Sequence, residues 1–171
     1  MSETGPRAPT CRRDQVSTRG VIARAVGDGW EGRYHHFDSE PSGLGRTGWR
    51  LYHGHFAGDV DAMLRTIVDE HPSGWSTIID ADFSQPAGFG LPTGANGKQP
   101  PSCYCHGSRS DKPHLFFEHG ECQGETCGSD AIEWVYVLSS GGMAILQCQD
   151  GRHVPTVFVP WHGPEPRWPR S

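Results

Sequence analysis

Four of the six cysteines in this 171-residue chain lie in one stretch, residues 103–127. Cys103 and Cys105 form a C-x-C pair, and Cys122 and Cys127 form a second pair separated by four residues. Zn²⁺ binds four thiolate or imidazole ligands in a tetrahedron, and two short ligand pairs from distant segments commonly supply them. The stretch therefore predicts a zinc site built from these four thiols.

Two histidines in the same stretch offer alternative ligands. His106 and His119 could each replace a cysteine, so a Cys3His set is also open. The site would be structural if four side chains bind the ion, and catalytic if three bind and water takes the fourth position. The spacing is not the commonest one for zinc, and a disulfide, a redox pair or unrelated thiols remain alternative interpretations.

The cysteine stretch does not follow the zinc-deaminase motif. Those enzymes combine H-x-E with a later P-C-x-x-C and use the glutamate as a proton shuttle. Here "PPSCYC" lacks the second spacing, and "HGE" at 119–121 follows the first cysteine pair. We therefore reject a deaminase.

His36 and Asp38 form a second candidate site, of a catalytic kind. They lie at the end of a predicted strand and share a face of it if the strand continues that far. Imidazole titrates near neutral pH, so such a pair could do acid–base work in a hydrolase. The structural alternative is a buried or capping histidine beside an aspartate that caps the next turn.

Ser17 is a third candidate, which depends on where translation begins. If the natural start is Val16, removal of the initiator methionine would expose Ser17, whose own α-amine could activate it as a nucleophile. The alternative is an ordinary flexible tail. Residues 1–16 are polar and aperiodic, and they predict a disordered leader.

Hydrophobic periodicity predicts the elements that position these residues. Asp59 is the expected N-cap of a helix from Val60 to His71, and Pro72 stops it. A second helix is expected within residues 44–56, and residues 84–102 read as a loop. The expected strands are a hairpin at 18–26 and 30–37, a strand at 75–79, and a meander at 133–138, 143–148 and 154–159.

These elements predict an α+β fold. Two helices would pack on an antiparallel sheet made of the N-terminal hairpin and the three-strand C-terminal meander. We expect one domain over residues 17–171, with a Cys-rich, zinc-binding insertion at about residues 100–128.

Composition narrows the classes of partner and location. The net charge is −5 and no block of lysine or arginine is present, which argues against nucleic acid. No apolar run approaches the ~20 residues of a membrane helix, and the first residues lack the apolar core of a signal peptide. The expected location is the cytoplasm, where thiols stay reduced, and the expected partner is an unidentified small molecule or protein.

Several segments resemble an uncharacterised family of actinobacteria and their phages. They are "STRGVIAR", "YHHFDSEPSGLG", "DEHPSGWSTI", "CYCHG" and "EWVYVL", spread over about residues 17–168. The resemblance supports Val16 as the start and implies no activity. It also implies that Cys127 is the family-type ligand, because family members carry Cys-Gly-x-Glu-Trp where this chain has "CGSDAIEW" and the additional Cys122.

Taken together, these features predict a small cytosolic zinc-binding protein that acts as a binding or accessory module. The alternative function is a hydrolase that uses either His36 and Asp38 or Ser17.

Overall fold

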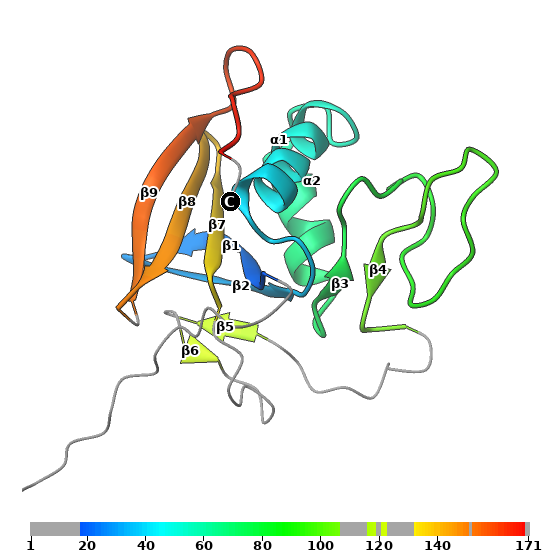
Figure 1. The fold of residues 1–171 in the computed structure, drawn as a ribbon, viewed down its shortest axis with the longest axis horizontal. Coiled ribbons are helices and arrows are strands. Elements are labelled where there is room, and N and C mark those ends of the chain that lie inside the picture. The colour runs from blue at the N-terminus through cyan, green and yellow to red at the C-terminus, as the bar shows by residue number, and fades with distance from the viewer. Residues whose placement is uncertain (1–17, 107–115, 119–120, 123–131, 151, 170–171) are drawn as a thin grey trace, which may run out of the picture.

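The computed structural model describes residues 18–106, 116–118, 121–122, 132–150 and 152–169, and the fold in this part of the chain is α+β (Figure 1). Its elements in chain order are β1 (Gly20–Val26), β2 (Gly29–His35), the π-helix η1 (Pro41–Gly45), α1 (Arg46–His53), α2 (Val60–Leu64), the π-helix η2 (Arg65–Asp69), β3 (Trp75–Thr77), β4 (Ser102–Cys103), β5 (Phe116–Glu118), β6 (Glu121–Cys122), β7 (Trp134–Ser139), β8 (Gly142–Gln149) and β9 (Arg152–Pro160).

The sheet is mixed, so the prediction of a purely antiparallel sheet is wrong. Seven strands follow the order β4-β3-β2-β1-β7-β8-β9, and β5 pairs with β2 and with β6. The β1–β7 and β2–β3 pairs are parallel, whereas the other pairs are antiparallel. The predicted hairpin and meander are both present, and the parallel β1–β7 pair joins them into one sheet.

The surroundings of β1 are compatible with its parallel pairing. Val21 and Ala23 belong to one buried cluster and Ile22 belongs to the other, so both faces of this strand lie in apolar surroundings. Parallel pairs occur mainly in sheets that are covered on both faces. Local alternation predicted each hairpin, but it carries no information on how the hairpin and the meander meet.

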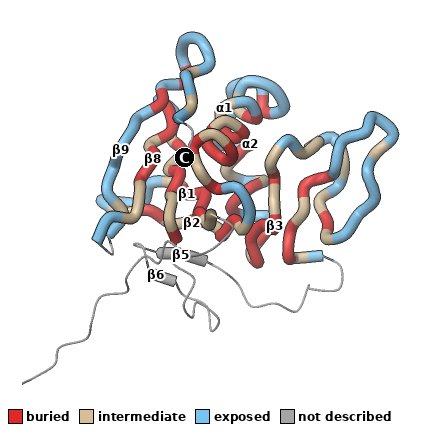
Figure 2. Tube along the Cα trace, in the orientation of Figure 1, coloured by how far each residue is buried: buried red, intermediate tan, exposed pale blue. Residues whose placement is uncertain are grey.

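The helices lie together against one side of the sheet (Figures 1 and 2). Asp59 caps α2 as predicted, since its carboxylate accepts a hydrogen bond of 2.8 Å from the Ala62 N–H. The helix then widens into η2 and ends at Asp69, two residues before the predicted end. Met63 and Ile67 from this segment are fully buried in the main core.

The helix predicted within residues 44–56 lies slightly earlier in the chain than predicted. It begins as η1 and continues as α1, which ends at His53. Gly43 allows the chain to make this entry, because a Cβ there would lie 2.2 Å from the backbone oxygen of Asp38. Within the described residues, no helix is both long and apolar enough to cross a membrane.

Candidate metal centre

Three metal-ligating side chains from two segments meet beyond the end of η2. One ring nitrogen of His71 and the Sγ atoms of Cys103 and Cys105 all lie within 4.8 Å of one another. In a tetrahedral zinc site, neighbouring ligand atoms are about 3.5–3.8 Å apart, given the usual Zn–S and Zn–N lengths. Small side-chain rotations would therefore let one ion contact all three atoms.

Backbone hydrogen bonds bring the two segments together. Cys103 lies opposite Trp75 in the β3–β4 pair, and the Tyr104 N–H donates to the Gly74 carbonyl over 3.0 Å. Residues 71–74 form a tight turn in which the Gly74 N–H donates to the His71 carbonyl. Gly74 has φ +74° and a Cβ there would meet the Tyr34 carbonyl at 2.7 Å, so this turn requires glycine.

The surroundings favour a thiolate at Cys105. The Cys103 thiol donates toward Cys105 and lowers the pKa of Cys105, and contacts from His71 and Ser73 lower it further against the opposing effect of burial. The Ser73 N–H lies 3.3 Å from the Cys105 Sγ. The same shared proton, together with burial, raises the pKa of Cys103. The pair thus loses its first proton readily from Cys105, and a metal ion would displace the second.

Arg33 places a positive charge beside this thiolate. Its side chain donates to the carbonyls of Val68 and Pro72, at 2.6 and 3.3 Å, and so holds the end of η2 against β2. Burial lowers the pKa of Arg33, while Asp69 and Cys105 raise it. The interaction with Cys105 is therefore attractive and compensates part of the charge that two thiolates would bring.

His71 carries a buried polar atom that a metal ion would satisfy. The side chain is 7% exposed, and its Nδ1 has no hydrogen-bond partner within the described part of the chain. Its ring lies against the Trp75 ring, with the centroids 4.2 Å apart. An ion bound to the ring nitrogen that faces the two thiols would satisfy that atom of the buried ring.

His106 lies next to the same group. Its Nδ1 is 3.1 Å from the Cys103 Sγ, and its ring centroid is 5.7 Å from that of His71. His106 is exposed, so it would close the site on its solvent side. His106 lies outside the three-residue group, and a turn of its ring toward the other two ligands would make a Cys2His2 set.

The structure describes only some of the predicted ligands. Cys103 and Cys105 are both free thiols and lie together, with the alternate ligand His106 beside them. The backbone of Cys122 pairs with Phe117 in β5, but its side chain, together with Cys127 and His119, lies outside what the structure describes. Cys148, which was not predicted as a ligand, is disulfide-bonded.

Sequence reasoning missed His71, although a signal was present. At helical spacing, His71 shares one face of the predicted helix with the apolar residues Val60, Met63, Leu64, Ile67 and Val68. It is the only charged or polar member of that face, and it directly precedes Pro72, where the chain must turn. A histidine at such a boundary, in a chain with a C-x-C-H motif, was a candidate ligand on residue type alone.

His35, which precedes the candidate residue His36, is a buried structural histidine. It is fully buried, and its Nε2 accepts a hydrogen bond from the Ile78 N–H over 3.1 Å while its Nδ1 lies 2.8 Å from the Ser39 hydroxyl. An acceptor at Nε2 requires a neutral ring with the proton on Nδ1. Burial accordingly lowers the pKa of His35 to about 3. Through the hydrogen bond from Ile78, the neutral His35 ring links β2 to the residue that follows β3.

His36 and Asp38 do not share a strand face, because β2 ends at His35. The His36 Nδ1 lies 2.6 Å from the Tyr34 hydroxyl, whereas Asp38 is exposed and has φ +52°. The alternation on which the catalytic hypothesis rested therefore stops before Asp38. Ser17, the other candidate nucleophile, lies outside the described residues.

Comparison with known proteins found no matching family model, no matching curated protein and no matching solved structure. The resemblance to the actinobacterial and phage family thus stays a prediction.

Proposed function

We propose that this protein is a small binding module in which a structural zinc ion, held by His71, Cys103, Cys105 and His106, fixes the turn after η2 to the β3–β4 pair. The observation that carries the proposal is the meeting of three ligand atoms within 4.8 Å, drawn from segments about thirty residues apart in the chain.

The donor set supports zinc among the common metals. Two thiolates with two imidazoles suit a tetrahedral, borderline-soft ion, whereas Mg²⁺ and Ca²⁺ take oxygen ligands. The burial of His71 adds support, because one nitrogen of this buried ring lies within 4.8 Å of both thiols.

A structural site fits better than a catalytic one. Four protein ligands leave no position for water, and the buried Cys103 and His71 lie on the core side of the group. The competing hydrolase function would need an open fourth position, and the exposure of His106 is the observation that favours it. The two proposals differ in what metal removal does: a structural site loses stability, whereas a catalytic site loses activity with little change in stability.

A cytoplasmic location is part of the proposal, and one observation opposes it. Free thiols at Cys103 and Cys105 suit a reducing compartment, whereas the disulfide at Cys148 suits an oxidising one. Counting the reactive thiols in protein purified without reductant would distinguish a reducing from an oxidising compartment. Recovery of all six cysteines as free thiols supports the cytoplasm.

The experiment that tests the site is metal analysis of purified variants. Elemental analysis of the native protein should give one zinc per chain, and Cys105→Ala should abolish it. His162→Ala is the matched control, since His162 is exposed and far along the chain from the site. Retention of full zinc content in Cys105→Ala would rule out this ligand set.

A further inference from the structure

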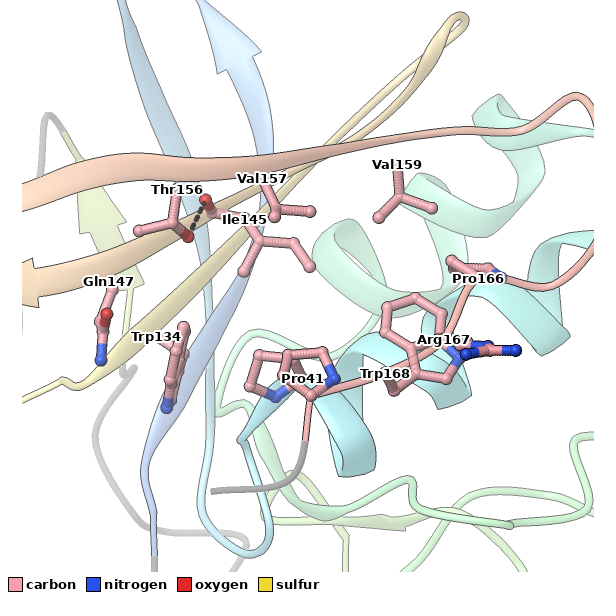
Figure 3. Close-up of a pocket in the computed structure, with 11 residues that line it drawn as sticks. Pro41, Trp134, Ile145, Gln147, Thr156, Val157, Val159, Pro166, Arg167 and Trp168 are labelled. Carbon is pink, nitrogen blue, oxygen red and sulfur yellow. Dashed lines mark hydrogen bonds between the residues drawn. The ribbon is translucent and has the colours of Figure 1, made fainter.

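A cavity of about 280 Å³ lies between the outer strands of the sheet and the C-terminal tail (Figure 3). One wall comes from the sheet, with Trp134 at the start of β7, Ile145 in β8 and Val157 in β9. The other comes from Pro41 at the start of η1 and from Trp168 in the tail. Figure 3 shows the two tryptophan rings on either side of Pro41, facing the aliphatic side chains of the sheet.

The tail wall is held in place by specific contacts. Arg50 of α1 forms an ion pair of 3.1 Å with Glu165, and the Trp168 indole N–H donates to the same carboxylate. Trp168 also packs on the chain at Gly45, where a Cβ would meet its ring at 3.1 Å. Both tryptophans are only partly buried, so each presents ring surface to the cavity while its backbone is fixed.

The polar groups of the cavity are few and lie apart. Gln147 lies directly opposite Trp134 in the β7–β8 register, and Arg167 is exposed beside Trp168. Thr156 also lines the cavity, but its hydroxyl donates to the Ile145 carbonyl over 3.0 Å. Arg167 is the one ionisable side chain among the described residues that line the cavity, and no carboxylate lines it. The Glu165 carboxylate next to Trp168 is paired with Arg50, so the charge of Arg167 gives the rim a preference for an anion.

The neighbouring edge of the sheet does not favour a peptide strand as the occupant. β9 is the last strand in the sheet order, and it is apolar and exposed at Val157 and Phe158. However, Pro155 has no N–H to donate, and the β8–β9 register shifts beside it. Proline and bulges are the devices that prevent strand addition at an edge.

We propose that this cavity binds a small flat aromatic carboxylate, with the ring between Pro41 and the aliphatic side chains of β8 and β9 and the carboxylate at the rim beside Arg167. Trp134 and Trp168 flank this position and give a flat ring edge contacts at both ends. A mostly apolar cavity with a few separated polar groups is the usual form of a small-molecule site. This proposal rests on the proposed function, because it names the ligand class of that binding module.

Three matched probes test the charge preference. 2-Naphthoate, 2-naphthalenemethanol and 2-naphthylmethylammonium share one ring system and differ in charge. For a probe of about 13 non-hydrogen atoms we expect a Kd on the order of 1 mM or tighter. Naphthoate should bind most tightly and the ammonium compound least. NMR titration of the indole N–H signals of Trp134 and Trp168 gives the affinity and the location together.

Two variants at exposed positions test the site without disturbing the core. Val157→Trp places a large ring in the cavity and should weaken every probe at least about tenfold through lost cavity volume. Arg167→Gln should weaken naphthoate about two- to fivefold, as for an exposed ion pair, and leave the alcohol unchanged. Equal affinity for all three probes, or naphthoate binding that survives Val157→Trp, overturns the proposal.

The same samples separate this proposal from the zinc site. Protein that contains zinc but shifts neither tryptophan signal refutes the ligand class and leaves the metal proposal standing. Protein that binds naphthoate but contains no zinc refutes the metal proposal and leaves the cavity standing.

Discussion

Acidification should destabilise this protein through His35. The folded state holds the ring neutral with a pKa of about 3, whereas the ring in the unfolded chain has the ordinary value of 6.5. Below pH 6.5 the His35 ring therefore binds a proton in the unfolded state but not in the folded state. The contribution of His35 is fully present above pH 6.5 and is lost as the pH falls toward 3.

The magnitude follows from the width of that window. Each pH unit below 6.5 costs about 1.4 kcal/mol while the folded state stays unprotonated, so pH 5 should cost about 2 kcal/mol relative to pH 7.5. That is a large share of the free energy of unfolding of a typical domain, which is about 5–15 kcal/mol. The main cause is burial, with a smaller repulsion from His36, and protonating Nε2 would also remove the acceptor of the Ile78 N–H.

Urea unfolding followed by tryptophan fluorescence at pH 7.5, 6.5, 5.5 and 5.0 measures the effect. His35→Gln is the control, since the amide oxygen can accept from the Ile78 N–H but does not titrate in this range. The variant should be less stable at pH 7.5 and should depend less on pH. A histidine NMR titration of the wild type gives the pKa directly. A His35 pKa near 6.5, or identical pH slopes for both proteins, would show this reasoning to be wrong.

Three further changes test particular contacts of the fold. Tyr136→Phe should cost about 1–3 kcal/mol in urea unfolding, because the buried Ser39 carbonyl loses the hydroxyl that donates to it over 2.6 Å; an unchanged midpoint would contradict this. Gly43→Ala should lower the melting temperature in calorimetry, since a Cβ would lie 2.2 Å from the Asp38 oxygen, and a melting temperature equal to wild type would argue against that clash. Asp82→Ala should raise hydrogen exchange in residues 82–99, because this carboxylate accepts from several loop groups; exchange that stays the same there would mean that the loop is ordered by other contacts.

Local patterns predicted the elements well where the hydrophobic periodicity agreed with the capping and turn residues at the ends of a segment. The β1–β2 hairpin, the capping of α2 by Asp59 and the β7–β8–β9 meander all depend on residues close in sequence. Alternation and capping are properties of short segments, so one sequence is enough to recognise them.

The mixed sheet could not be predicted in the same way. The β1–β7 pair joins residues more than a hundred positions apart, and its direction depends on the path of the chain between them. Both faces of β1 are apolar, which was a hint of a covered strand, but a short apolar run is equally compatible with a covered antiparallel strand.

The candidate metal-ligand cluster was predictable in part. Cysteine spacing singled out Cys103 and Cys105, because thiols in a C-x-C pair are close whatever the fold. His71 joins them only through the tight turn at Gly74 and the β3–β4 pair, which are tertiary features. The role of His35 was hidden for a similar reason, since its partner Ile78 directly follows β3 and is distant in sequence.

Cobalt substitution measures the central claim most directly. Purified protein exchanged into Co²⁺ should bind one ion per chain, with the visible absorption of a tetrahedral site and a sulfur-to-cobalt band whose intensity corresponds to two thiolates. His71→Ala should weaken binding and alter the visible bands, while His162→Ala should match the wild type. A spectrum without thiolate bands, or one unchanged in Cys103→Ala and Cys105→Ala, would contradict the proposed metal centre.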